Sequence, residues 1–205
     1  KHFNPKQITT AIVFQSCLIL GILSLFFAIP FLVMIPFTGK KGISILLPFY
    51  LLAATGFIGM GVEIVILMVY QMQVGNLYHH VGIFFGLFMA GLAMGSQQSV
   101  QSMQNPDRSV ATTLIYTLGG FAGCLFFTPI LFEGLTMFFV SIPLIEIILF
   151  CWICVLAYGI GAIFPLAAAL MESQARDVPF IATYSILADN LGGTIGALFT
   201  GVLLI

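Results

Sequence analysis

The stretch "GFIGMGVEIVILMVY", residues 56–70, decides the fold because it contains no charged side chain apart from Glu63. The largely apolar run around it extends from about residue 45 to residue 71. A helix of about 20 apolar residues crosses a bilayer, so this run predicts a transmembrane helix. A charged side chain near the centre of such a helix costs at least about 2.5 kcal/mol. We therefore expect Glu63 to face protein and not lipid.

The composition of the whole chain supports the same fold class. Of its 205 residues, 60% are hydrophobic and only 6% are charged, whereas soluble domains carry about 25% charged residues. Long uncharged runs alternate with short segments that hold most of the charges. These features predict an all-α integral membrane protein. The net charge of -1 gives no reason to expect a nucleic-acid partner.

Loop signals divide the chain into six apolar runs and predict a bundle of about six transmembrane helices. The expected spans are approximately residues 8–36, 45–71, 78–98, 109–131, 143–171 and 180–205. Residues 1–205 would then form a single transmembrane domain. Because the chain begins with Lys1 and ends within an apolar run at Ile205, we expect this domain to be part of a longer polypeptide.

The basic residues indicate an orientation, because cytoplasmic loops of membrane proteins are enriched in Lys and Arg. Four of the six fall in loops on one side of the expected bundle: Lys40, Lys41, Arg108 and Arg176. The two N-terminal lysines are on the other side. This asymmetry predicts that the N-terminal end lies outside, and we expect a bacterial inner (plasma) membrane.

The histidines and cysteines give weak signals for a metal or redox centre. His79 and His80 are candidate ligands near the outer face, but adjacent residues of a helix point about 100° apart. We therefore expect no metal and no cofactor. The "CWIC" spacing at residues 151–154 leaves a redox pair as an alternative to simple packing. The four cysteines all lie in apolar runs, where cysteine commonly packs as a small hydrophobic residue: Cys17, Cys124, Cys151 and Cys154.

Glycines at helical spacing predict close contacts between the spans. Helices in lipid associate through small residues that let their backbones approach one another. The expected packing residues are Gly56, Gly59, Gly82, Gly86, Gly91, Gly95, Gly192 and Gly196.

Three carboxylates fall within the expected spans. Glu146 is one turn inside its helix, where the membrane interface and the helix N-terminus accommodate it without a special role. Glu63 and Asp189 are nearer the centres of their spans, and no span contains Lys or Arg. Three states would remove the cost of burying them: a neutral acid that donates a hydrogen bond, an acid facing a water-filled cavity, or an acid paired with an external cation. Gly56, Gly59 and Glu63 share one helix face, and Asp189, Gly192, Gly196 and Thr200 share another.

At these residues the chain resembles a known family, the membrane domain of multi-spanning spermidine synthase-like (polyamine aminopropyltransferase-like) proteins. The resemblance covers roughly residues 46–205 and begins with a glycine-rich helix and an aliphatic-Glu-aliphatic element. The first part of the resemblance lies in the stretch "LLAATGFIGMGVEIVILMVYQMQVGNLYHHVGIFFGLFMAGLAMGS". The positions of this stretch that match the family pattern are Gly56, Glu63, Gly75, Tyr78 and residues 91–96. The stretches "FPLAAAL" (164–170) and "ADNLGGTIGALFTG" (188–201) resemble two further family elements.

The resemblance implies a major-facilitator-like helical bundle and has two departures. Ile186 stands where the family often has a tyrosine, three residues before Asp189. No soluble aminopropyltransferase domain is recognisable, because nothing combines a strand pattern with a glycine-rich loop for an S-adenosyl donor. We therefore expect no enzyme activity from these residues.

Three functions remain open from the sequence. The first is a non-catalytic membrane domain or subunit that anchors or scaffolds a missing domain or partner complex. The second is a transporter or receptor for a polyamine or another amine, with Glu63 and Asp189 as intramembrane partners of the cation. The third is a membrane subunit of a redox complex.

Overall fold

The computed structural model describes residues 46–75, 77–104, 109–137, 141–172 and 178–204. They form five α-helices: α2 (Leu46–Gln73), α3 (Leu77–Met103), α4 (Val110–Met137), α5 (Ile142–Glu172) and α6 (Val178–Leu204). No strand occurs in these ranges. The expected all-α class is therefore correct. The first expected span, residues 8–36, lies outside the described residues.

Four of the described helices, α2 to α5, are long and apolar enough to cross a membrane. The chain is accordingly an integral membrane protein. The expected count of about six spans needs correction for the part that the structure describes, because α6 is not among these four.

The helices extend beyond the apolar runs that predicted them. α3 continues to Met103, past the expected end at residue 98, and α4 continues to Met137, past residue 131. Helix α2 ends where the amides of Val74 and Gly75 donate to the carbonyl oxygens of Tyr70 and Gln71 at 2.9 and 3.1 Å. Gly75 has a φ of 81°, a conformation that glycine adopts without the steric cost of a side chain.

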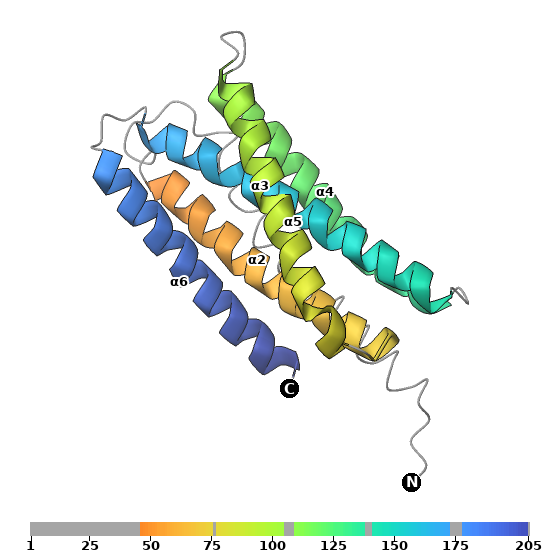
Figure 1. The fold of residues 1–205 in the computed structure, drawn as a ribbon. Coiled ribbons are helices and arrows are strands. Elements are labelled where there is room, and N and C mark those ends of the chain that lie inside the picture. Colours follow the sequence, from red (N-terminus) through yellow and green to blue (C-terminus); the bar gives the residue numbers. More distant parts are fainter. Residues whose placement is uncertain (1–45, 76, 105–108, 138–140, 173–177, 205) are drawn as a thin grey trace.

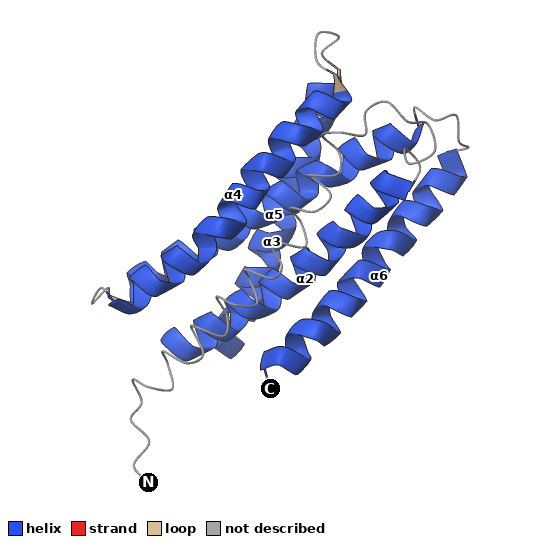
Figure 2. Ribbon diagram, turned by 180° about the vertical axis from the view of Figure 1, so that it is seen from behind, coloured by secondary structure: helices blue, strands red, loops and turns tan. Residues whose placement is uncertain are grey.

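Helix α5 is central to the bundle. It packs against α2, α3 and α4, whereas α6 packs mainly against the opposite side of α2 (Figure 1). Seen from behind, these four helices follow one another across the bundle in the order α4, α5, α2 and α6 (Figure 2). Residue contacts show that α2 and α6 run in the same direction, as do α3 and α5, while α2 and α4 run opposite to α5. The polar segments after α3 and α5 therefore begin at the same end of the bundle.

The core is apolar and follows from helical periodicity. Its largest fully buried side chains include Tyr70, Phe84 and Phe132. Helix α5 is buried along most of its length, as expected for an element with neighbours on several sides. Large apolar side chains on α3, α4 and α6 point outward, where a bilayer would cover them.

Candidate functional site

Helices α2 and α6 touch through small residues, and we call this the α2–α6 contact. A methyl group on Gly192 would overlap the backbone of Ala53, and one on Gly196 would overlap the backbone of Phe57. Both partners are main-chain atoms, which cannot move aside by changing rotamer. The two glycines therefore let the helix axes approach more closely than any larger residue would.

Asp189 belongs to the same α2–α6 contact. Its backbone and side-chain oxygens lie where a methyl group on Gly56 would be. One turn further along α2, Gly59 faces the Ile160 side chain of α5. The face of α2 that carries Gly56, Gly59 and Glu63 is thus directed toward the space between α6 and α5.

Helices α3 and α5 form a second close contact. Methyl groups on Gly91 and Gly95 would overlap the backbone of α5 at Cys154 and Tyr158, respectively. The Ser99 hydroxyl donates to the carbonyl oxygen of Ala162 at 2.8 Å and extends this contact by another turn. Gly91 and Gly95 thus lie in the kind of contact that their spacing suggested.

Gly82 and Gly86 lie on a different face of α3. Both are exposed, and a methyl group on either would meet no atom within 4 Å among the described residues. They do not pack against any described helix, contrary to the expectation for this pair. The reason is rotation: Gly91 and Gly95 turn toward α5, and Gly82 and Gly86 fall on the outward side.

Glu63 lies inside the bundle, with 5% of its surface exposed. Among the described residues, no hydrogen bond or ion pair involves its carboxyl group. Asp189 likewise has no such partner in the described ranges. None of the six Lys and Arg residues falls within these ranges. The helices that the structure describes therefore offer neither acid a basic side chain.

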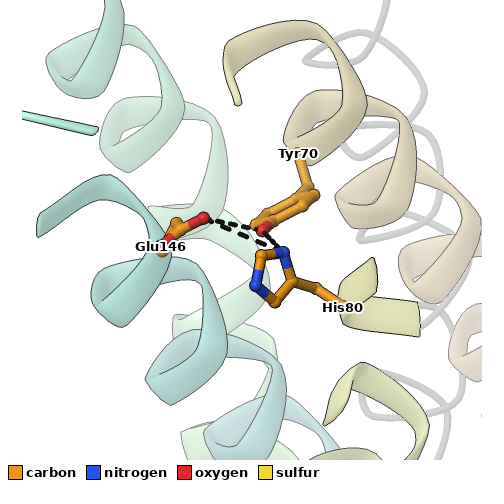
Figure 3. A network of polar contacts seen from close by, with 3 residues as sticks. All are labelled: Tyr70, His80 and Glu146. Atoms are coloured by element: carbon orange, nitrogen blue, oxygen red, sulfur yellow. Dashed lines mark hydrogen bonds and ion pairs between the residues drawn. The ribbon is translucent and has the colours of Figure 1, made fainter. Parts of the chain in front are cut away.

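A polar cluster at the other end of α2 joins three helices (Figure 3). The Tyr70 hydroxyl donates to Glu146 Oε1 at 2.9 Å and lies 2.7 Å from His80 Nδ1. Because the single hydroxyl hydrogen is directed at Glu146, the hydrogen between Tyr70 and His80 comes from Nδ1 of the imidazole. His80 Nδ1 and Glu146 Oε1 are 3.9 Å apart. We call these three residues the Tyr70 cluster.

Aromatic rings enclose the Tyr70 cluster from the core side. The Tyr70 ring meets Phe84 at 4.8 Å between centroids and Phe150 at 5.8 Å. Tyr70 is fully buried, whereas the side chains of His80 and Glu146 keep 29% and 24% of their surface exposed. The cluster can therefore fasten α2, α3 and α5 together while its two titratable ends stay in contact with the surroundings.

The Tyr70 cluster was not predicted from the sequence. Glu146 was expected to have no special role, but the structure gives this carboxylate a hydrogen bond from Tyr70, 76 residues away in the chain. His79 is exposed and does not join His80. No group of three or more His, Cys, Asp and Glu residues in the described part could hold a metal ion.

The three described cysteines are free thiols. Cys151 is exposed, while Cys124 and Cys154 are partly buried, so the "CWIC" spacing forms no disulfide. Cys17 lies outside the described residues.

Comparisons with known proteins give no match: no family model, no curated protein and no solved structure is similar to the chain. The class of the protein comes from the fold of the described residues, which is that of an all-α integral membrane protein.

Proposed function

We propose that this chain is a non-catalytic integral-membrane domain that anchors or scaffolds a partner domain or subunit. The proposal includes a relationship to the membrane domains of spermidine synthase-like proteins and a major-facilitator-like arrangement of the helices. It also includes a bacterial inner membrane, with the N-terminal end outside.

The observation that carries this proposal is the shortness of the connections between the described helices. Only three to six residues separate consecutive helices from α2 to α6. An active site for a polar substrate needs a pocket with convergent polar groups. The hydroxyl groups of Ser99 and Tyr70 instead tie one helix to another.

The outward faces supply surface for a partner as well as for lipid. α3 exposes Met89 and α4 exposes Tyr116, among other large side chains. On the outward face of α4, Gly119, Gly120 and Gly123 meet no described atom. Such small residues permit close approach of another membrane helix.

Site-specific photo-crosslinking in native membranes tests the anchoring function. A photoreactive residue is placed at Met89 on α3, Tyr116 on α4 or Ile195 on α6, with buried Leu156 as the control position. Anchoring predicts a protein adduct of one discrete mass from at least one outward face and none from Leu156. Adducts to lipid alone from every outward face would contradict it.

An amine carrier or receptor is the second candidate function. The observation that favours it is the absence of partners for Glu63 and Asp189 among the described residues. Proteoliposomes loaded with a radiolabelled diamine would test it. A carrier should exchange the label across the membrane and lose this exchange in Glu63→Gln, whereas a domain that only anchors should show none.

A further inference from the structure

Thr200 differs from the hydrogen-bonded threonines of the bundle. Six threonines donate their hydroxyl hydrogen to the carbonyl oxygen four residues earlier, at 2.8 to 3.3 Å: Thr55, Thr113, Thr117, Thr128, Thr183 and Thr194. Thr200 is fully buried, and its Oγ1 has no hydrogen-bond partner in the described part of the chain. A buried hydroxyl without a partner costs about 1 to 3 kcal/mol. The orphaned Oγ1 thus points to a partner that is not one of the described protein groups.

The register of the α2–α6 contact places Thr200 level with Glu63. Gly192 meets Ala53 and Gly196 meets Phe57, so four residues on α6 correspond to four residues on α2. One more turn in this register brings Thr200, which shares the face of Gly192 and Gly196, to the level of residues 60–64 of α2. Glu63 is in that range, 5% exposed and without a described partner.

We propose that Glu63 and Thr200 form a site for one monovalent cationic group, either an alkali metal ion or a protonated primary amine. A carboxylate and a hydroxyl are oxygen ligands for hard cations, and both accept hydrogen bonds from an ammonium group. The bound charge compensates Glu63, and Oγ1 of Thr200 supplies a neutral ligand. One such guest satisfies both Glu63 and Thr200, neither of which has a partner among the described residues.

Asp189 is not part of this site. It lies against Gly56, seven residues before Glu63, which corresponds to about 10 Å along the helix axis. A single small cation cannot contact both acids. The site deepens the second candidate function by naming its binding residues, but it requires no transport and is independent of anchoring.

Thermal unfolding of the full chain in detergent tests the site. The probes are sodium, potassium and methylammonium chloride, each compared with N-methylglucamine chloride at equal ionic strength. We expect at least one probe to raise the unfolding midpoint in a saturable way, since a ligand of the native state stabilises it. A response to alkali ions alone identifies a metal-ion site, and a response to methylammonium alone identifies an amine site.

Matched variants assign the effect to the two residues. Thr200→Val keeps the shape but removes Oγ1, and we expect it to weaken binding up to about tenfold; Glu63→Gln should abolish the saturable shift. Thr194→Val, which changes an exposed residue of the same helix, is the control and should bind as the parent does. The proposal is overturned if no probe shifts the midpoint relative to N-methylglucamine, or if the shift is unchanged in Thr200→Val and Glu63→Gln.

Infrared spectroscopy gives a second readout if Glu63→Gln does not fold. Cation binding should leave Glu63 as a carboxylate. The Thr200→Val protein should then need a higher cation concentration than the parent to show the same carboxylate band. In an Asp189→Asn background, which removes the other unpartnered acid, a carboxylic-acid band that persists at saturating concentrations of every probe would show that Glu63 holds a proton instead, which would refute the site. Loss of binding with intact photo-crosslinks, or the reverse, separates this inference from the anchoring function.

Discussion

Substitution of Gly196 by alanine should destabilise the bundle, although alanine normally stabilises a helix. The new methyl group would overlap the backbone of Phe57 on α2, so the two helices would have to separate. Overpacking of this kind costs about 1 to 3 kcal/mol. The matched control is Gly86→Ala on α3, where a methyl group meets no described atom and the helix gains up to about 1 kcal/mol.

Because the gain in helix propensity is common to both substitutions, the expected difference between the two variants is the overpacking cost of about 1 to 3 kcal/mol, with Gly196→Ala the less stable. Unfolding in mixed micelles, titrated with sodium dodecyl sulfate and followed by circular dichroism, measures it. Gly192→Ala should behave like Gly196→Ala, because its methyl group would overlap the backbone of Ala53. Equal stability of Gly196→Ala and Gly86→Ala would refute the reasoning, since it would mean that the α2–α6 contact is not maintained in the micelle.

Three further predictions concern the Tyr70 cluster, the orientation and the absence of donor binding. Tyr70→Phe removes the hydroxyl that joins His80 and Glu146 and should lower the unfolding free energy by about 1 to 3 kcal/mol, whereas Tyr116→Phe, exposed on α4, should change little in the same titration. In a cysteine-free background, an impermeant thiol reagent added outside whole cells should label Asn76→Cys and miss Gln104→Cys; the reverse pattern would invert the orientation. Titration calorimetry of the purified chain with S-adenosylmethionine should show no saturable heat, and micromolar binding would contradict a non-catalytic domain.

Much of the fold could be predicted from the sequence because it depends on local patterns. Uncharged runs of sufficient length predict membrane helices wherever they occur, and the ranges of α2 to α6 match five of the expected runs. The helix ends were less accurate, because Gln and Ser residues after the apolar part of α3 continue the helix. Ser102, for example, donates to the carbonyl oxygen of Gln98 at 2.9 Å.

The contacts between helices could be predicted only in part. Glycine spacing identified both faces that pack closely, at Gly91 with Gly95 and at Gly192 with Gly196. The same spacing also selected Gly82 and Gly86, which face outward. Spacing defines a face of a helix, but it does not reveal the rotation of that face relative to its neighbours, which depends on all the helices at once.

The Tyr70 cluster shows why the candidate site was harder to predict than the fold. Its members are separated by 10 and 76 residues in the chain, and none of the three forms a local motif with the others. They meet because α2 and α5 run in opposite directions and α3 begins close to where α2 ends, which brings the end of α2 to the beginnings of α3 and α5. Glu146 therefore gains its hydrogen bond from the directions of the helices, and these same directions leave Glu63, two turns further back along α2, beyond the reach of that cluster. Two acids on facing helices thus have different chemistry: one is satisfied by a buried tyrosine, and the other needs a guest or a proton.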